Sequence, residues 1–451
     1  MINRFLYKSY RFFYISREWR KKSFTLPGIM VLSVIVVTAC LGIDTNQSTI
    51  YQIYTLLLSI LSISIISSFF FKAKFNIKRK PPKFATVGES LVYTIEILNL
   101  TKKKQYGLFL YENSEDLRPT FDELLNSREP GEENRNVWDR KVLYHRWLWL
   151  IDLKRKCSSS SYKIPSLSPN GRADVSVILE PLKRGFIHLS GVTITRPDPF
   201  GLFNSFVNIL KPEKILVLPK RYKLPSVNLP GTRKYHSGGI ALASSIGNSD
   251  EFVSLRDYRP GDPIRQIHWK SWAKTGDLIV KEYQDEFFVR HALILDTYQE
   301  KQHSEIFEQA VSVASSFVCS IGTQESLLDL MFIGEQAYSF SSGRGMSQYD
   351  KLLEILACVK ACNKRDVSDL LPKIIEYAPL LSGCVCVFLT WDDERKEIVK
   401  KLIAFNVPVK VLVITDSISS LGSIDPGPMK SFINNFHILE TDNIEEGLSK
   451  I

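Results

Sequence analysis

The run His291-Ala-Leu-Ile-Leu-Asp296 decides the fold of the carboxyl-terminal part of the chain. Its uninterrupted apolar centre is typical of a strand that is buried on both faces of a sheet. From Ser304 to Ser320 the apolar residues recur at helical spacing on one face, which predicts an amphipathic helix. This alternation predicts a doubly wound, parallel α/β domain over residues 286–451. Its further elements are strands at 327–334, 384–390 and 407–415 and helices at 348–362 and 393–405.

Acidic residues stand where two of these predicted strands end. Asp296 closes the first strand and is followed by Glu300, and Asp392 comes just after the strand at 384–390. Because the carboxyl ends of parallel strands meet at one edge of a sheet, the three carboxylates could form an oxygen-rich site for Mg²⁺. The alternative is that they are solvated acids of the kind that commonly end strands.

The densest unusual stretch of the sequence runs from residue 250 to residue 281 and precedes the α/β domain. Within it, Arg259-Pro-Gly-Asp262 predicts a turn from which Asp262 caps a short helix. Gly276 is placed to end that helix, since glycine readily adopts a left-handed conformation. The residues that would share one face of the helix are Arg265, His268, Trp269 and Trp272.

The charges of this stretch admit two interpretations. Its basic side chains could hold a carboxylate, a phosphate or the acidic patch of a partner protein. Alternatively, they pair with the acidic residues of the same stretch, while the two tryptophans fill a gap between domains. The basic residues are Arg256, Arg259, Arg265 and Lys270, and the acidic ones are Glu251, Asp257, Asp262 and Asp277.

A β-rich domain is predicted over residues 72–220. Short alternating or β-branched runs separated by turns, such as 90–98 and 173–179, indicate an antiparallel, sandwich-like sheet structure. Residues 112–161 are polar and poorly periodic, which predicts a long insertion or mobile loop with a small cluster around its tryptophans at most. Residues 221–285 form the linker and the dense stretch, and Gly and Ser are frequent at 231–248.

Two uncharged apolar segments lie near the amino end, at 26–43 and 50–71. Each approaches the ~20 residues with which a helix spans a bilayer, so residues 26–71 are predicted to form two transmembrane helices. The joining loop, 44–49, contains no Lys or Arg, whereas both outer flanks are strongly basic. The positive-inside rule therefore places residues 1–25, a basic leader, and the soluble domains in the cytoplasm, on a multi-pass protein of the plasma membrane.

Two other interpretations of these segments remain open. Val37-Thr38-Ala39-Cys40 resembles a lipoprotein cleavage box, in which Cys40 would start an exported chain. The apolar segments could also form a buried helical hairpin of a soluble core.

Composition excludes several classes of function. The formal charge of +10 and the pI near 9.0 arise largely from the flanks of the apolar segments, which indicates a membrane partner and no nucleic acid. The seven cysteines form no CxxC pair and are expected to be reduced thiols. The sequence contains no GxSxG, HExxH or Walker motif, and its seven histidines occur singly, so we do not expect an enzyme.

Residues 250–281 resemble the signature of the bacterial domain of unknown function 58 family, with a Glu-Phe, an Arg-x-Tyr-x-x-Gly-Asp and an Ile-x-Trp-Lys run in order. A second similar element is Lys183-Arg-Gly-Phe, followed by Arg196-Pro-Asp-Pro-Phe-Gly-Leu-Phe203, so the resemblance extends over nearly the whole chain. It implies a β-domain followed by a von Willebrand factor A-like α/β domain. It also implies action with a MoxR-type AAA+ ATPase in the assembly or maturation of other proteins.

Metal-binding members of the von Willebrand factor A-like fold end their first strand in Asp-x-Ser-x-Ser, whereas this chain has Asp296-Thr-Tyr-Gln-Glu300. Tyr298 and Glu300 replace both hydroxyl ligands, so the usual Mg²⁺ site is expected to be lost or altered. The candidate metal ligands are Asp296, Glu300 and Asp392. The candidate partner-binding or interdomain residues are Glu251, Arg256, Tyr258, Gly261, Asp262, Arg265, Trp269 and Lys270.

We therefore expect two amino-terminal transmembrane helices, an antiparallel β-domain and a doubly wound α/β domain, acting together as a cytoplasm-facing scaffold or adaptor without a cofactor. One alternative is a metal-dependent ligand-binding domain. The others are an enzyme with an unrecognised site and a sensor of anionic lipid that uses the basic flanks.

Overall fold

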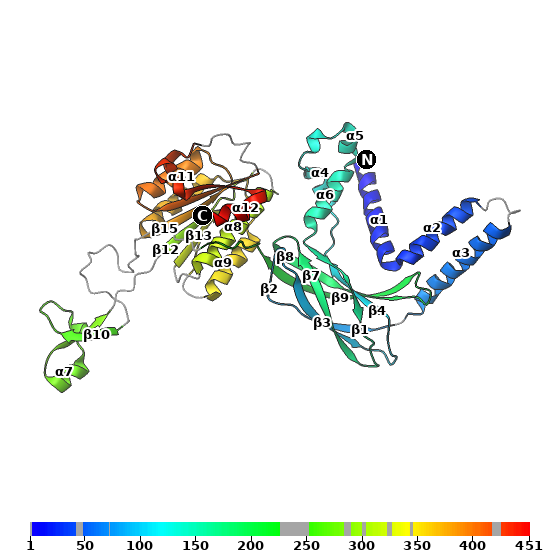
Figure 1. Ribbon diagram of the computed structural model, residues 1–451, viewed down its shortest axis with the longest axis horizontal. Coiled ribbons are helices and arrows are strands. Elements are labelled where there is room, and N and C mark those ends of the chain that lie inside the picture. Colours follow the sequence, from blue (N-terminus) through cyan, green and yellow to red (C-terminus); the bar gives the residue numbers. More distant parts are fainter. Residues whose placement is uncertain are drawn as a thin grey trace. The chain divides into compact units, whose positions relative to one another are not determined.

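The computed structural model describes residues 2–41, 48–71, 73–225, 252–283, 290–299, 304–322, 327–342, 346–416 and 425–451. The chain divides into two compact units, Met1–Leu218 and Pro219–Ile451 (Figure 1). The expected Gly- and Ser-rich linker at 231–248 and most of the loop at 44–49 lie outside the described residues.

The amino-terminal unit begins with three helices, α1 (Ile2–Ser23), α2 (Leu26–Leu41) and α3 (Ser48–Phe69). Helices α2 and α3 lie side by side (Figure 1). Among the described residues, α3 is the helix that is long and apolar enough to cross a membrane, and most of it is not covered by the rest of the protein. The apolar part of α2, Leu26–Cys40, is shorter than a full span. The expectation of two transmembrane helices is therefore supported for one of them.

A β-sandwich follows the helices, as the alternating runs predicted. One sheet has the order β1-β3-β7-β5 and is antiparallel throughout. The other has the order β2-β9-β8-β4-β6 and is antiparallel except where β2 pairs with β9. The strands are β1 (Phe75–Lys80), β2 (Phe84–Thr86), β3 (Leu91–Asn99), β4 (Leu108–Ser114), β5 (Cys157–Ser159), β6 (Ser161–Ile164), β7 (Arg172–Pro181), β8 (Gly185–Pro197) and β9 (Asn204–Leu218).

The core of the sandwich consists of the alternate, inward-facing residues of both sheets. In β3, for example, Ile95 and Ile97 are fully buried while the residue between them is not. One ion pair is enclosed with these residues: Nε of Arg79 lies 2.7 Å from Oε1 of Glu112, and both side chains are almost wholly buried. The hydroxyl of Tyr93 donates to the same Glu112 oxygen at 2.6 Å. The charges are thus matched inside the core, as buried ions require.

The insertion predicted at 112–161 is structured, which corrects the expectation of a long mobile loop. Its ends belong to β4, β5 and β6, and its middle forms the helices α4 (Phe121–Asn126), η1 (Glu132–Asn134), α5 (Val137–Val142) and α6 (Tyr144–Lys154). Trp147 is 2% exposed in a small core with Leu124 and Leu150, whereas Trp138 is 78% exposed. The leader residues Tyr7 and Tyr10 pack against this core. The sequence did not predict these helices because their apolar residues pack against α1, which lies more than a hundred residues earlier in the chain.

The carboxyl-terminal unit contains the predicted doubly wound α/β sheet. Its strand order is β14-β13-β12-β15-β16-β17, parallel except for β14. The strands are β12 (Arg290–Leu295), β13 (Leu327–Ile333), β14 (Ala337–Ser342), β15 (Gly383–Phe388), β16 (Val409–Thr415) and β17 (Phe436–Glu440). Chain connections run outward in both directions from β12, so the strand order switches between β12 and β15.

Helices cover both faces of this sheet (Figure 1). On one face, α8 (Glu305–Gly322) contacts β12, β13, β15 and β16 through the apolar side that the sequence predicted, and α9 (Met346–Cys358) packs against α8. On the other face, a continuous core joins the strands to α10 (Leu371–Tyr377) and α11 (Asp393–Ala404). The remaining short helices are η3 (Val367–Leu370), η4 (Ala378–Leu380), η6 (Gly427–Asn435), η7 (Thr441–Asn443) and α12 (Ile444–Ser449).

The dense stretch forms a separate small hairpin. Strands β10 (Phe252–Asp257) and β11 (Ile279–Tyr283) pair antiparallel, and η2 (Ile264–Gln266) and α7 (Trp269–Thr275) lie between them. The expected single helix capped by Asp262 is wrong, because His268 interrupts it with non-helical backbone angles. Gly276 does end α7 in the left-handed conformation, with φ of 80°, as predicted.

Candidate functional site

The switch in strand order places the loops that follow β12 and β15 next to each other. In open α/β sheets this is where ligands usually bind, because the two loops diverge there. The first loop begins with Asp296 and Tyr298, and the second leads through Leu389 and Asp392 into α11. The structure therefore brings the predicted residues Asp296 and Asp392 together, while Glu300 lies outside the described residues.

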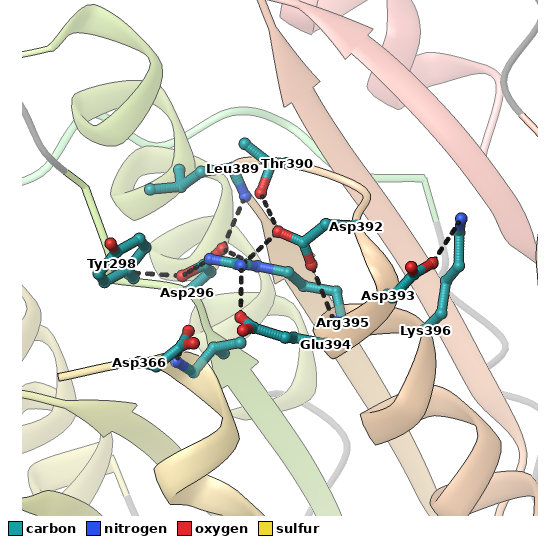
Figure 2. Close-up of polar contacts among 11 residues, drawn as sticks. Asp296, Tyr298, Asp366, Leu389, Thr390, Asp392, Asp393, Glu394, Arg395 and Lys396 are labelled. Carbon is teal, nitrogen blue, oxygen red and sulfur yellow. Dashed lines mark hydrogen bonds and ion pairs between the residues drawn. The ribbon is translucent and has the colours of Figure 1, made fainter.

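Asp296 is fully buried at this edge and its carboxylate is held by four donors. Its Oδ1 accepts the backbone N–H of Tyr298 at 3.0 Å, and its Oδ2 accepts that of Leu389 at 3.2 Å. The guanidinium of Arg395 supplies the other two, with Nε 3.1 Å from Oδ2 and Nη2 3.3 Å from Oδ1 (Figure 2). This fork-to-fork arrangement is the usual geometry of a strong Arg–carboxylate pair.

Arg395 is the residue that organises the site, and the sequence did not single it out. It projects from the first turn of α11, and its side chain is only 2% exposed. Besides Asp296, it contacts Asp392, with Nη1 2.5 Å from Oδ2, and Glu394, with Nη1 3.4 Å from Oε2 (Figure 2). Asp392 also caps α11 by accepting the N–H of Arg395 at 3.1 Å. A single guanidinium thus lies among three carboxylates.

The protonation equilibria of the site depend on this guanidinium. Burial raises the pKa of Asp296, and the charge and hydrogen bonds of Arg395 oppose that rise. At the outer side, a hydrogen bond with Asp366 raises the pKa of Glu394 to about 7. For Asp296, the Arg395 guanidinium favours the ionised carboxylate, whereas burial favours the protonated form.

Two of the predicted Mg²⁺ ligands, Asp296 and Asp392, face a cationic side chain in this arrangement. Both Asp296 and Asp392 direct carboxylate oxygens to Arg395, whose guanidinium provides the positive charge that a cation would bring. Within the part of the chain that the structure describes, no group of three or more His, Cys, Asp or Glu side chains is arranged to hold a metal. The chemistry of this edge is electrostatic: a fixed, desolvated cation surrounded by acids.

The hairpin gathers the other predicted residues into a cluster of its own. Arg256 forms a two-pronged pair with Asp262, with both N–O distances at 2.8 Å. That contact, together with the backbone N–H of Arg259, lowers the pKa of Asp262 to about 2. Gly261, with φ of 109°, forms the turn that brings the two side chains together. The interpretation as an internal ion pair is confirmed for Arg256 and Asp262.

The remaining candidate residues of the hairpin lie around this ion pair. Trp269 and Trp272 contact each other edge to face at 5.7 Å and are 53% and 43% exposed, and Ile264 is 68% exposed. Arg265 and Lys270 are exposed, and the backbone N–H of Tyr258 donates to Leu278. Glu251 lies outside the described residues. The hairpin thus combines an internal ion pair with an exposed aromatic and apolar surface.

The second family-like element, residues 196–203, has a structural role that sequence reasoning did not assign. Oδ1 of Asp198 accepts the N–H groups of Leu202 and Phe203 at 2.6 and 2.8 Å, which closes a tight turn. Thr25, between α1 and α2, donates its hydroxyl to Gly201 at 2.5 Å. A Cβ on Gly28 would lie 2.0 Å from the carbonyl oxygen of Leu202, so only glycine allows this approach. The turn therefore holds the start of α2 against the β-sandwich.

Comparison with known proteins supports part of the expected resemblance. Residues 254–376 match the family model described as "Protein of unknown function DUF58". The chain is also 26% identical to the uncharacterized protein YeaD of Bacillus subtilis over 196 residues, which are 43% of this chain and 47% of that protein. The chain thus spans about half the length of this relative, and the family model covers residues 254–376 of the nearly whole-chain resemblance that was expected.

Two solved structures match parts of the chain at low identity. A PapD-like domain of human CEP192 is 15% identical, with 32% of this chain and 85% of that chain covered and a TM-score of 0.17. An aerotolerance-related membrane protein of Bacteroides fragilis is 10% identical, with 28% and 66% covered and a TM-score of 0.22. The informative similarity is therefore that of residues 254–376, which include most of the hairpin and Asp296, to the DUF58 family.

Proposed function

We propose that this chain is a membrane-anchored adaptor without enzymatic activity, whose soluble units face the cytoplasm and bind a protein partner. Helices α2 and α3 form the multi-pass anchor in the plasma membrane. The orientation follows from the lysines and arginines that flank both apolar segments. The partner that best fits the family resemblance is a MoxR-type AAA+ ATPase acting in the assembly or maturation of other proteins.

The observation that carries this proposal is the exposed aromatic surface of the hairpin. Trp269 and Trp272, with Ile264 beside them in sequence, leave large apolar side chains in solvent on a small element whose own ion pair is already satisfied. Tryptophans are enriched in the energetically dominant centres of protein interfaces, and exposing them without a partner is unfavourable. Exposed Lys270, next to Trp269 in the sequence, suits an acidic rim on the partner.

The α/β unit is proposed to be a von Willebrand factor A-like domain in which Arg395 has replaced the metal ion. Its doubly wound sheet and the position of Asp296 at the end of β12 support this assignment. A fixed guanidinium makes the sheet edge independent of divalent cations, which favours an adaptor over the metal-dependent alternative. Calorimetric titration with Mg²⁺ separates the two, because an adaptor with Arg395 in place gives no site-specific heat.

The adaptor proposal is tested by crosslinking in the native membrane. The double variant Trp269→Ala/Trp272→Ala should lose most of the crosslinks to an AAA+ ATPase, since truncating central interface tryptophans typically costs at least about 2 kcal/mol each. Trp138→Ala is the matched control, because Trp138 is 78% exposed but lies in the insertion. It should leave the crosslinks unchanged.

Three results would count against the proposal. Recovery of the same partners with the double variant would remove the hairpin from the interface. Repeated absence of an AAA+ ATPase among the crosslinked proteins would refute the partner. Cleavage of the soluble units by protease added to intact cells would show that these units lie outside the cell, which would refute the cytoplasmic orientation.

A further inference from the structure

Helix α1 has two apolar faces, and the rest of the unit covers one of them much more than the other. On the covered face, the hydroxyl of Tyr10 donates to the carbonyl of Val142 at 2.8 Å, and its ring lies 5.9 Å from that of Trp147. Tyr7 makes equivalent contacts, with its hydroxyl 3.3 Å from the carbonyl of Pro119. Tyr14 also packs against the insertion. This face therefore fixes the rotation of α1 about its axis.

The uncovered face carries a stripe of large aromatic side chains. Phe5, Phe12 and Trp19 are spaced seven residues apart, so they fall on one side of the helix, and they are 71%, 67% and 47% exposed. Ile2 and Phe13, 74% and 65% exposed, border the stripe. Trp19, at the carboxyl end of the stripe, also contacts the rings of Phe24 and Phe203. Because the tyrosine face is fixed against the insertion, α1 cannot rotate to bury Phe5 and Phe12 in its own unit.

Basic side chains line the stripe. At about 100° per residue, Lys8 and Arg11 fall on one side of it and Arg20 on the other. All three are exposed. An apolar, aromatic face bordered by lysine and arginine is the pattern of a helix that lies in the interface of an anionic bilayer, with its apolar side among the acyl chains and its cations at the headgroups.

The position of α1 in the chain leads to the same surface. It ends at Ser23, and the apolar helix α2 begins at Leu26, where Thr25 and the turn around Asp198 hold the start of α2. Since α2 packs along α3, the helix long enough to span a membrane, the carboxyl end of α1 lies where the chain enters the bilayer. Its aromatic stripe is thus continuous in the chain with the membrane anchor.

We propose that α1 is an interfacial membrane helix, which rests on anionic lipid through Phe5, Phe12 and Trp19 and presents its tyrosine face to the helical insertion. This assignment rests on the membrane anchoring proposed above. It adds a second, lipid-facing contact that holds the insertion, and with it the β-sandwich, close to the membrane surface.

The test uses the full chain in vesicles of phosphatidylglycerol and phosphatidylethanolamine, with a photoreactive p-benzoylphenylalanine replacing one residue at a time. Phe12 and Phe5 report on the stripe, Ile63 on the anchor helix α3, and Tyr14 on the packed face of α1. After irradiation, mass spectrometry should find lipid adducts at Phe12, Phe5 and Ile63, and an adduct within the chain at Tyr14. With phosphatidylcholine as the only lipid, the yield at Phe12 should fall at least about fivefold, the effect of one cationic side chain at an anionic surface, while that at Ile63 should stay constant.

Three patterns would overturn the inference in distinguishable ways. Lipid adducts at Ile63 with none at Phe12 or Phe5, or with adducts there to a second copy or another protein, would refute the interfacial helix and leave the anchor intact. No lipid adduct at Ile63 would refute the anchor itself, and the interfacial helix with it. Equal yields at Phe12 in both lipids would refute the anionic surface.

Discussion

Replacing Arg395 by methionine should destabilise the α/β unit because it leaves a buried carboxylate without its counter-charge. Asp296 is fully buried, and the Arg395 side chain is 2% exposed. Methionine fills much of the same volume but donates no hydrogen bond. Asp296 then retains the backbone N–H groups of Tyr298 and Leu389 as its donors, and it loses both guanidinium contacts.

The expected cost is about 3–5 kcal/mol, the range for removing one partner of a buried ion pair. An exposed pair in the same unit provides the control. Arg365 and Asp369 are 3.8 Å apart with side chains 48% and 46% exposed, so Arg365→Met should cost about 0–1 kcal/mol.

Hydrogen exchange of the full chain, followed by mass spectrometry, measures the effect in this unit alone. Amides of β12 and β15 that exchange by unfolding of the unit should exchange roughly a hundred to several thousand times faster in Arg395→Met, and less than about fivefold faster in Arg365→Met. The double variant Asp296→Asn/Arg395→Met should recover much of the protection, because it removes the unpaired charge. If the double variant exchanges as fast as Arg395→Met, the ion-pair reasoning is wrong.

The stability of Arg395→Met should also change with pH in a defined direction. Burial already raises the pKa of Asp296, and without Arg395 nothing but the two backbone donors opposes that rise. In folded Arg395→Met, Asp296 then keeps its proton at pH values where the unfolded chain, with an ordinary pKa of 3.8, has released it. The free energy of unfolding of this variant therefore falls as the pH rises from 3.8 through the raised pKa of Asp296. The difference in free energy of unfolding between wild type and Arg395→Met should therefore become smaller as the pH is lowered towards 3.8.

The remaining predictions concern three other titrating groups. The hydrogen bond with Asp366 raises the Glu394 pKa to about 7, so the stability that this bond contributes is lost as pH rises from about 4.5 through 7. Glu394→Gln should therefore flatten the pH dependence of stability over that range. Burial lowers the pKa of His291 to about 4, so the wild-type α/β unit should lose up to about 3 kcal/mol as pH falls from 6.5 to 4, and His291→Gln should lose less. Asp198→Ala should cost about 2–3 kcal/mol, because it removes the acceptor of three backbone N–H groups.

Each of these has a refuting outcome, and two have a matched control variant. Asp393→Asn changes a fully exposed acid beside Glu394 and should keep the wild-type pH profile of stability. An unchanged profile in Glu394→Gln would refute the raised pKa of Glu394. If His291→Gln loses as much stability as wild type when the pH falls from 6.5 to 4, His291 is not the cause of that loss. Exposed Asp174 is the control for Asp198, and equal hydrogen exchange of the 198–203 turn in Asp174→Ala and Asp198→Ala would refute the role of Asp198.

The central strands were predictable because of where they lie. A strand covered on both faces has few positions for polar residues, so β12 and β15 each carry a continuous apolar run, and β16 does so after Lys410 at its second position. The edge strands β14 and β17 were not predicted, because each pairs on one side only and carries polar residues. The sandwich strands were predictable from their alternation for the complementary reason, since one face of each meets water.

The sequence by itself determined the order of the parts: apolar helices first, an antiparallel β-domain next and an α/β sheet last. It also placed Asp296 and Asp392 at strand ends, because local periodicity is enough to locate those ends. Only the tertiary structure decided that Arg395 reaches Asp296, 99 positions earlier, and that the leader helix packs on an insertion beyond residue 115. Such contacts depend on which elements become neighbours in space, and a pattern that repeats every two or 3.6 residues carries no information about them.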